Sequence, residues 1–274
     1  MGTSVGISTT VRADNTFLVQ GRTVTLPVHV RDATSMSAMF IVSADAVRRL
    51  LPCQQQLQVP ELIPGRTVCV VAGIEYHDND LGQYNEVSIA FFVRYGTHRP
   101  VPLAGMLSGF LRKDLGAYIH RLPVTTSFSR DAGRDIWGFP KTVDQIAFHD
   151  DARQRTCTWV AGGAEVLTFS MRRGGRRRMK DMPQDAFAWR DGILWKTPST
   201  MGGDGVGVRL RGATVRLGTH PIADELRALG FTAPEPTRAL MSTWVEHMRA
   251  QFEAPVRMAR GTSSASTSWH RPSA

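Results

Sequence analysis

The feature that most limits the fold of this chain is a series of ten short segments in which apolar and polar residues alternate. Alternation with a period of two is typical of strands that bury one face. Turn-forming residues such as Gly162-Gly163, Gly202-Gly203 and Asp80-Leu81-Gly82 separate many of them. Because a long flat sheet exposes its edges, we expect an antiparallel sheet that closes or half-closes into a β-barrel. The expected strands cover residues 23–42, 67–74, 85–95, 118–122, 142–148, 156–161, 165–172, 192–196, 206–210 and 212–217.

Helical periodicity is confined to a few short segments, the first of which Ser43 can cap. We expect helices over residues 44–51, 129–137, 222–229 and 237–252. In the last of these, five apolar residues recur at helical spacing, which indicates one face in the core. They are Leu240, Trp244, Val245, Met248 and Phe252. The expected fold class is therefore mainly β, a β-rich α+β protein with a few short helices.

The composition favours one large domain. Hydrophobic residues make up 42% and charged residues 21% of the 274 positions, which excludes wholesale disorder. A single β-rich domain often reaches about 200–250 residues, so the length requires no second domain. We expect an N-terminal arm over residues 1–22, a barrel domain over residues 23–258 and, because residues 259–274 are rich in Ser and Thr and aperiodic, a disordered tail.

Neither a membrane span nor a secretion signal is expected. Apolar runs such as residues 68–72 fall well short of the roughly 18 residues that a span needs. The first residues lack a basic segment followed by an apolar one, so the expected location is the cytoplasm. Cys53, Cys69 and Cys157 are odd in number and lack CxxC spacing, which favours small buried side chains in a reducing compartment.

The positive charge of this chain is largely local. The chain has 33 Lys and Arg against 24 Asp and Glu, a net charge of +9, and six of the cations lie between Arg172 and Lys180 with no acid among them. Gly174-Gly175 is placed like a turn, and no aromatic residue there offers stacking for bases. We therefore interpret the segment as a solvated hairpin tip, with nucleic acid or another anionic partner as the alternative.

The sequence predicts no metal and no cofactor. The eight histidines contain no pair at HxH or HxxxH spacing, which would direct two imidazoles at one ion. A GxSxG nucleophile motif and a phosphate-binding glycine loop are also absent. We interpret the glycine-rich residues 201–207 as hairpin turns.

The most informative stretch is residues 131–143, which read DAGRDIWGFPKTV. A short helix capped by Ser129 or Asp131 would end at Gly138, and Pro140 would prevent it from resuming. The chain must then turn and present Lys141 at the start of the next strand. Upstream, Glu86 lies near the start of a strongly apolar strand, where a buried carboxylate would need a function.

Two motifs about fifty residues apart carry a resemblance. The YxE motif of Tyr84 and Glu86 and the GR(E/D)xxG(F/Y)PK motif of Gly133 to Lys141 together resemble the acetoacetate decarboxylase family and its wider superfamily of Schiff-base lyases. Residues 44–52 and 241–255 add weaker matches, so the similarity covers most of residues 23–258. The resemblance implies a cone-shaped antiparallel β-barrel, a homo-oligomer and an active site inside the barrel.

By this resemblance Lys141 forms an imine with the keto group of a β-keto acid, and Glu86 is an active-site glutamate. A protonated imine withdraws electrons from the carbon that bears the carboxylate, so carbon dioxide can leave. An ordinary lysine, with a pKa of ~10.4, is neutral in only about one molecule in 2,500 at pH 7. Such a lysine must therefore be activated by burial or by a nearby cation, and we expect Phe139 and Trp137 to provide the burial.

This chain departs from the family pattern at two positions. Thr142 follows the lysine where the decarboxylases have a second lysine, and a second family glutamate falls near Val71. Two alternatives to a β-keto acid decarboxylase are therefore open. One is a Schiff-base aldolase-dehydratase of the same superfamily, and the other is a non-catalytic barrel that binds a ligand.

Further residues are candidates for the substrate site. Arg31 and Arg134 could hold a substrate carboxylate with two hydrogen bonds, and Phe139 could line the pocket. Tyr84 and His120 could shuttle protons, although residues of these types more often have a purely structural place in a barrel wall.

Overall fold

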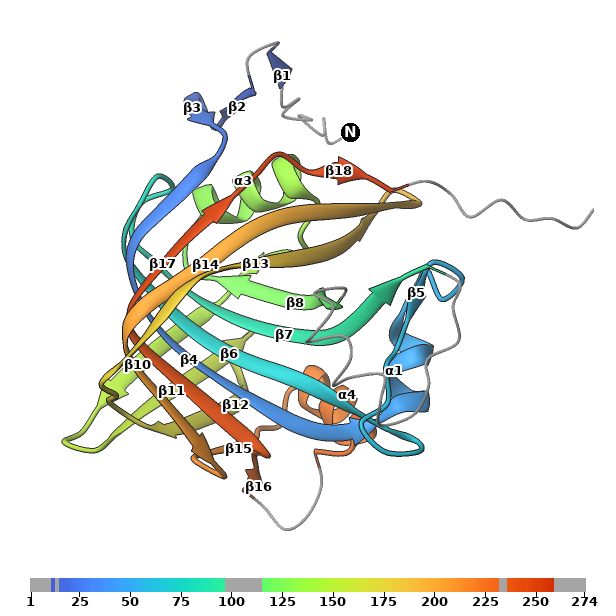
Figure 1. The fold of residues 1–274 in the computed structure, drawn as a ribbon, viewed down its shortest axis with the longest axis vertical. Coiled ribbons are helices and arrows are strands. Elements are labelled where there is room, and N and C mark those ends of the chain that lie inside the picture. Colours follow the sequence, from blue (N-terminus) through green and yellow to red (C-terminus); the bar gives the residue numbers. More distant parts are fainter. Residues whose placement is uncertain (1–10, 13–14, 97–114, 232–235, 259–274) are drawn as a thin grey trace, which may run out of the picture.

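The computed structural model describes residues 11–12, 15–96, 115–231 and 236–258. Strands dominate these residues, with three short helices among them: α1 (Ala44–Leu50), α3 (Ser127–Trp137) and α4 (Pro221–Leu229) (Figure 1). The mainly β class is therefore confirmed. The expected tail, residues 259–274, lies outside the described residues.

Seven strands close into the barrel (Figure 1). In order around it they are β7 (Tyr84–Tyr95), β6 (Arg66–Asn79), β4 (Val28–Ser43), β17 (Met241–Phe252), β14 (Ile193–Leu210), β13 (Arg177–Arg190) and β8 (Leu115–Val124). Pairing of β8 with β7 closes the ring, which removes the exposed edges of an open sheet. The ladder is antiparallel except where β8 runs parallel to β13 and to β9 (Lys141–Val143).

A second sheet covers one side of the barrel. It consists of β10 (Gln145–Asp150), β11 (Gln154–Ala161), β12 (Ala164–Arg172), β15 (Ala213–Leu217) and β16 (Thr237–Arg238). Short strands complete the described structure: β1 (Val11–Arg12), β2 (Thr16–Val19) and β3 (Arg22–Thr25) form a small sheet, β5 (Leu57–Gln58) pairs with β7, and β18 (Val256–Arg257) pairs with β14.

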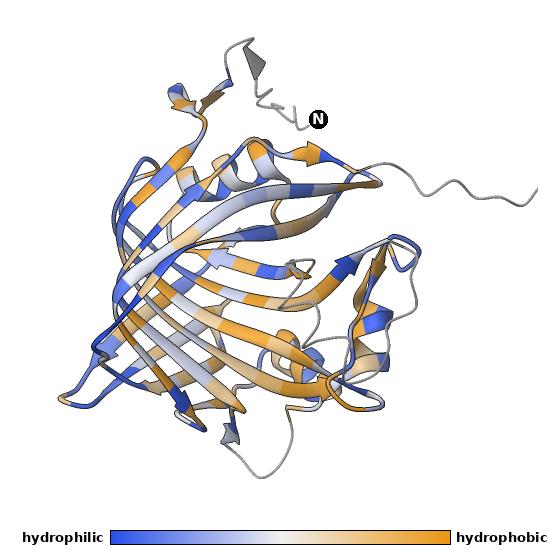
Figure 2. Ribbon diagram, viewed as in Figure 1, coloured by the Kyte–Doolittle hydropathy of each residue, from blue (hydrophilic) through white to orange (hydrophobic). Residues whose placement is uncertain are grey.

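Two apolar clusters occupy opposite faces of the barrel strands. The outer core lies between the barrel and the second sheet and contains, for example, Val71 and Phe91 from the barrel and Phe169 from β12. The inner core contains Tyr76 and Tyr84 from the other face of β6 and β7, together with residues of α3. Figure 2 shows hydrophobic residues recurring along the barrel strands, which separate the outer core from the inner core. Strand alternation therefore divides each barrel strand between the two cores.

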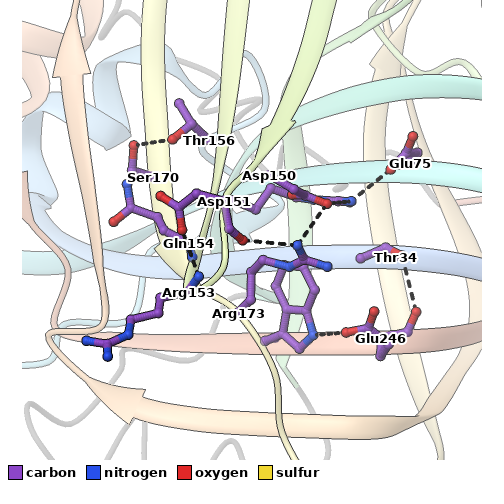
Figure 3. Close-up of polar contacts among 12 residues, drawn as sticks. Thr34, Glu75, Asp150, Asp151, Arg153, Gln154, Thr156, Ser170, Arg173 and Glu246 are labelled. Carbon is purple, nitrogen blue, oxygen red and sulfur yellow. Dashed lines mark hydrogen bonds and ion pairs between the residues drawn. The ribbon is translucent and has the colours of Figure 1, made fainter.

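A polar cluster ties the second sheet to the barrel (Figure 3). Arg155 of β11 forms ion pairs with Asp150 of β10 at 2.6 Å and with Glu75 of β6 at 2.9 Å. Arg173 pairs with Asp150 at 3.3 Å, and both guanidinium groups lie within 6 Å of the Trp244 ring. Neighbouring residues of a strand point to opposite faces. Glu75 points to the outer face of β6, so Tyr76 points to the inner face.

The N-terminal hairpin β2–β3 packs on α3. Arg22 lies 3.9 Å from the centre of the Phe128 ring, and Gln20 donates a hydrogen bond to Asp131. Phe17 belongs to the inner core. Described residues of the expected arm therefore help to cover the barrel.

Two expected helix ends are confirmed. Ser43 caps α1 by accepting a hydrogen bond from the Ala46 N–H, and α3 ends at Gly138 in the left-handed conformation. The expected α3 cap, Ser129 or Asp131, is wrong, because Thr126 caps the helix and accepts a hydrogen bond from the Ser129 N–H.

The expected helix over residues 237–252 is wrong, because residues 241–252 form the strand β17. Register shifts between Val245 and Ala250 interrupt its pairing with β4. Trp244 belongs to the outer core, whereas Val245 and Met248 belong to the inner one, so apolar residues on both faces of this strand together imitate the spacing of a helix.

The glycine-rich residues 201–207 were expected to form turns, but they lie within the 18-residue strand β14. Residues 173–176 are likewise no hairpin tip: β12 and β13 belong to different sheets, so this loop connects the two. A side chain at Gly175 would overlap the backbone of Val206, which shows that the loop packs directly on β14. The arginines 176–178 are exposed, as expected.

Candidate active site

The motif around Lys141 folds into a helix end followed by a sharp turn. After Gly138, the Phe139 N–H donates to the Gly133 carbonyl and the Lys141 N–H donates to the Phe139 carbonyl. Lys141 then opens β9 in parallel register with Leu122 of β8. The expected placement of this lysine at the start of a strand is confirmed, and the turn directs its side chain inward.

Lys141 and Glu86 form a buried ion pair. The Lys141 Nζ lies 2.8 Å from Glu86 Oε2, and the two side chains are 5% and 7% exposed. A charged pair so deeply buried costs desolvation energy that a structural role seldom requires. A nucleophilic amine forms when the ammonium gives up a proton, and the Glu86 carboxylate lies at the right distance to receive it.

Two tyrosines complete the surroundings of this pair. The Tyr76 hydroxyl donates to Glu86 Oε1 at 3.1 Å, so each carboxylate oxygen has its own partner. The Tyr84 ring stacks on Tyr76 and its centre lies 5.1 Å from the Lys141 Nζ. Burial and the nearby Glu86 carboxylate raise the pKa of both tyrosines well above the ordinary value. Both therefore remain phenols, and Tyr76 can hold the carboxylate in one orientation.

Gly133 makes room for the lysine stem. A β-carbon at this position would lie 2.5 Å from Lys141 Cδ and 2.7 Å from Cε. The glycine of the motif is thus required by close packing between α3 and the lysine. Phe139 is buried in the inner core and stacks on Trp137, which binds the Glu253 carbonyl through its indole N–H.

The structure brings Lys141, Glu86 and Tyr84 together, but it places three other candidates elsewhere. Arg31 pairs with Asp78 and Asp80 and is half exposed. Arg134 lies on the exposed side of α3. His120 Nε2 lies 2.7 Å from a carboxylate oxygen of Glu225 on α4.

The two departures from the family pattern also have clear positions. Thr142 is exposed and donates a hydrogen bond to Asp144, so its side chain points away from the buried Lys141. Val71 belongs to the outer core, on the opposite face from Glu86. The sequence indicated neither Tyr76 nor the role of Gly133, although Tyr76 shares the alternating pattern of its strand.

Other features of the described residues point to no second site. Within them, no three His, Cys, Asp or Glu side chains gather to hold a metal ion, and none of the helices is long and apolar enough to cross a bilayer. A cavity of about 550 Å³ lies between residues 51–56 and the β13–β14 turn, and no predicted site residue lines it. Its thiol, Cys53, has a pKa raised to about 11 by burial and is a poor nucleophile.

Comparison with known proteins gives one family and several structures. A family model described as acetoacetate decarboxylase matches residues 19–232. No curated protein matches the chain significantly. The acetoacetate decarboxylase of Legionella pneumophila is 14% identical, with a TM-score of 0.58, over 85% of this chain and 87% of the other.

Two other solved structures are similar in fold. The enduracididine biosynthesis enzyme MppR, complexed with pyruvate, is 15% identical with a TM-score of 0.54, over 84% of this chain and 90% of its own. The same enzyme is known in complex with the condensation product of pyruvate and imidazole 4-carboxaldehyde. An acetoacetate decarboxylase-like enzyme from Sphingomonas wittichii RW1 is 12% identical with a TM-score of 0.54, over 86% and 94% of the two chains.

Proposed function

This chain belongs to the acetoacetate decarboxylase family, and we propose that it decarboxylates a β-keto acid through an imine on Lys141. The observation that carries this proposal is the buried Lys141–Glu86 pair at the end of the GRDxxGFPK motif. A lysine enclosed by aromatic rings and one carboxylate suits carbonyl chemistry, because water is excluded and the proton has one acceptor.

Imine formation uses both members of the pair. Glu86 takes a proton from the ammonium, and the Lys141 amine attacks the keto carbon to give a carbinolamine. The carboxyl proton then goes to the carbinolamine oxygen, which leaves as water as the C=N bond forms. The resulting imine carries a proton and a positive charge on nitrogen.

Decarboxylation follows because this cation accepts electrons. The bond between the α-carbon and the carboxylate breaks, and its electron pair forms the C=C bond of a neutral enamine as carbon dioxide leaves. The face of the Tyr84 ring, 5.1 Å from the nitrogen, stabilises the cation before this step. Protonation of the α-carbon and hydrolysis of the imine release the ketone and restore Lys141.

A second function, aldol condensation and dehydration, is favoured by the departure from the family pattern at Thr142, where the decarboxylases have a second lysine. MppR, with a similar fold, is known with a condensation product of pyruvate bound. In that reaction the enamine would form by loss of a proton from the α-carbon of the imine, not of carbon dioxide, and its α-carbon would attack the carbonyl carbon of an aldehyde.

Product analysis in wild type and in Lys141→Ala tests the proposal. We expect β-keto acids to release carbon dioxide with wild type and at least about a thousandfold more slowly with Lys141→Ala. Lys196→Ala is the matched control, because Lys196 is also partly buried and paired with a carboxylate, that of Asp185. Its turnover should equal that of wild type.

The outcomes separate the candidates. Consumption of added aldehyde without release of carbon dioxide would favour the aldolase-dehydratase. Equal turnover by Lys141→Ala and wild type would contradict both enzyme proposals, and absence of turnover in both would favour a non-catalytic barrel. The family resemblance also leads us to propose a cytoplasmic homo-oligomer, which light scattering of the purified protein and fractionation of the source cells would test.

A further inference from the structure

The inward face of the barrel continues beyond Glu86 as two ordered rows. Glu86 lies opposite Ile74, and two residues further along these strands Ser88 lies opposite Ala72. Ala72 lies opposite Ser37 of β4, which lies opposite Thr243 of β17. We name these four residues, Ser88, Ala72, Ser37 and Thr243, the hydroxyl row.

The hydroxyl row ends at the reactive lysine. Glu86 pairs with Val124 and Ile89 with Arg121, so the same register places Ser88 opposite Leu122. Leu122 in turn lies beside Lys141. A molecule bound covalently to Lys141 therefore has three hydroxyl-bearing side chains along one neighbouring row of the barrel wall.

An apolar row follows one pleat further on. It consists of Ala90, Val70, Met39 and Met241, again directly opposite one another on successive strands. The two rows are about 6.7 Å apart, because they are two strand residues apart. The wall thus changes from charged at Lys141 and Glu86, through polar, to apolar.

Neither row is packed like a core. Ser37, Ser88, Thr243, Met39, Val70 and Met241 are only half-buried. Ala72 and Ala90 are buried but belong to neither apolar cluster. Val208 and Leu210 extend the two rows onto β14 and are 47% and 81% exposed. An exposed apolar surface that continues from a reactive group is typical of a ligand site.

Resting on the proposed function, we propose that these rows bind the chain of a medium-length β-keto acid, which crosses the hydroxyl row and places its apolar end on the apolar row. An extended chain advances about 1.2 Å per bond, so the apolar row lies about five or six bonds from the hydroxyl row. Acetoacetate leaves both rows empty. The preferred substrate therefore has roughly eight carbons or more.

A series of straight-chain 3-oxo acids from 3-oxobutanoate to 3-oxodecanoate tests the length. Each methylene buried on the apolar row should raise kcat/KM about fourfold, so 3-oxooctanoate should exceed acetoacetate at least about tenfold. Ser37→Leu fills the hydroxyl row and should lower kcat/KM for 3-oxooctanoate more than for acetoacetate, so that the preference is lost. Thr158→Leu, which adds similar bulk on the half-buried outer side of β11, is the control and should keep the preference.

A binding measurement separates this inference from the proposed function. Calorimetry of 3-hydroxyoctanoate with Lys141→Ala should show binding that Ser37→Leu in the same background weakens at least about tenfold. No binding, or binding that Ser37→Leu leaves unchanged, would overturn the inference whether or not the protein is an enzyme. Turnover through Lys141 without chain-length preference would overturn the inference alone.

The exposed apolar residues have one other conceivable occupant, a second copy of this chain. Sedimentation of Leu210→Ser tests this alternative. If an oligomer dissociates in this variant, and both Ser37→Leu and Leu210→Ser keep the chain-length preference, these apolar residues form an interface between copies of the chain. That result would contradict a substrate site. We expect Leu210→Ser to leave the oligomeric mass unchanged and to lower kcat/KM for 3-oxodecanoate selectively.

Discussion

Replacing Gly133 with alanine tests how closely the helix end controls the reactive lysine. The new methyl group would lie 2.5 Å from Lys141 Cδ and 2.7 Å from Cε. Carbon atoms of neighbouring groups settle at about 3.5–4.0 Å, so the stem must move by about 1 Å. The stem can move because it belongs to a flexible side chain, whereas the α3 backbone is fixed by its packing on the barrel.

The effects on stability nearly cancel. A shift of 1 Å would lengthen the Lys141–Glu86 contact from 2.8 Å to about 3.8 Å, which at an effective dielectric constant of 20 weakens the attraction by about 1.5 kcal/mol. Alanine in a helix interior is about 1 kcal/mol more favourable than glycine. The free energy of unfolding should therefore change by less than about 1 kcal/mol. Activity should fall about a hundredfold, because a reacting group misplaced by 1 Å costs roughly that factor.

Urea unfolding and turnover of the same preparation check both numbers. Arg130→Ala, on the same helix and paired with Asp131 at the surface, is the control for changes in α3 itself and should keep its turnover. Wild-type turnover in Gly133→Ala would refute the reasoning, since the lysine would not depend on this contact. A loss of more than about 4 kcal/mol in unfolding free energy would also refute it, because the helix and not the side chain would then have yielded.

Three further changes have defined outcomes. Tyr76→Phe removes a hydrogen bond to the Glu86 carboxylate that is worth about 1.5–3 kcal/mol, so kcat should fall about tenfold to a hundredfold. An unchanged kcat would show that Glu86 does not need this hydrogen bond to act. Thr142→Lys should leave the pH profile of turnover unaltered, because its ammonium would lie outward beside Asp144, and a shifted profile would contradict this placement. The pKa of Glu225 is lowered to about 2: burial opposes the charged form, but hydrogen bonds from His120 and Arg121 favour it more strongly. The charged Glu225 therefore stabilises the folded protein above about pH 4.5, and this contribution is lost as the pH falls to 2. Urea unfolding across this range should show a loss of up to about 3 kcal/mol in wild type and a smaller loss in Glu225→Gln, and equal losses would contradict the assignment.

The closed barrel could be predicted from local alternation, but its details depend on contacts that local patterns do not contain. The strand over residues 177–190 was not expected, because Pro183 and exposed polar residues on both faces obscure the period of two. The parallel pairing of β8 with β13 joins segments far apart in the chain. Register between such strands is fixed by packing and not by either segment alone.

The site could be predicted in part. The motifs identify Lys141 and Glu86, which the structure places 2.8 Å apart. Tyr76 was missed because its contact with Glu86 depends on cross-strand register. Arg134 follows Gly133 in a helix, and successive helical residues point about 100° apart, so a Gly133 that faces the lysine turns Arg134 away. The outward direction of Arg134 thus follows from the helix and from the contact between Gly133 and Lys141, and only the folded structure reveals that contact.

The mass of the Lys141 peptide after borohydride reduction tests the central claim most directly. Protein turning over acetoacetate is reduced, digested and compared with protein reduced without substrate. The account predicts that the peptide gains the mass of a reduced acetone imine, which records both the bond to Lys141 and the loss of carbon dioxide. An unmodified peptide, under conditions in which carbon dioxide is released, would contradict the imine. An adduct that keeps the carboxylate without any release of carbon dioxide would contradict the decarboxylation.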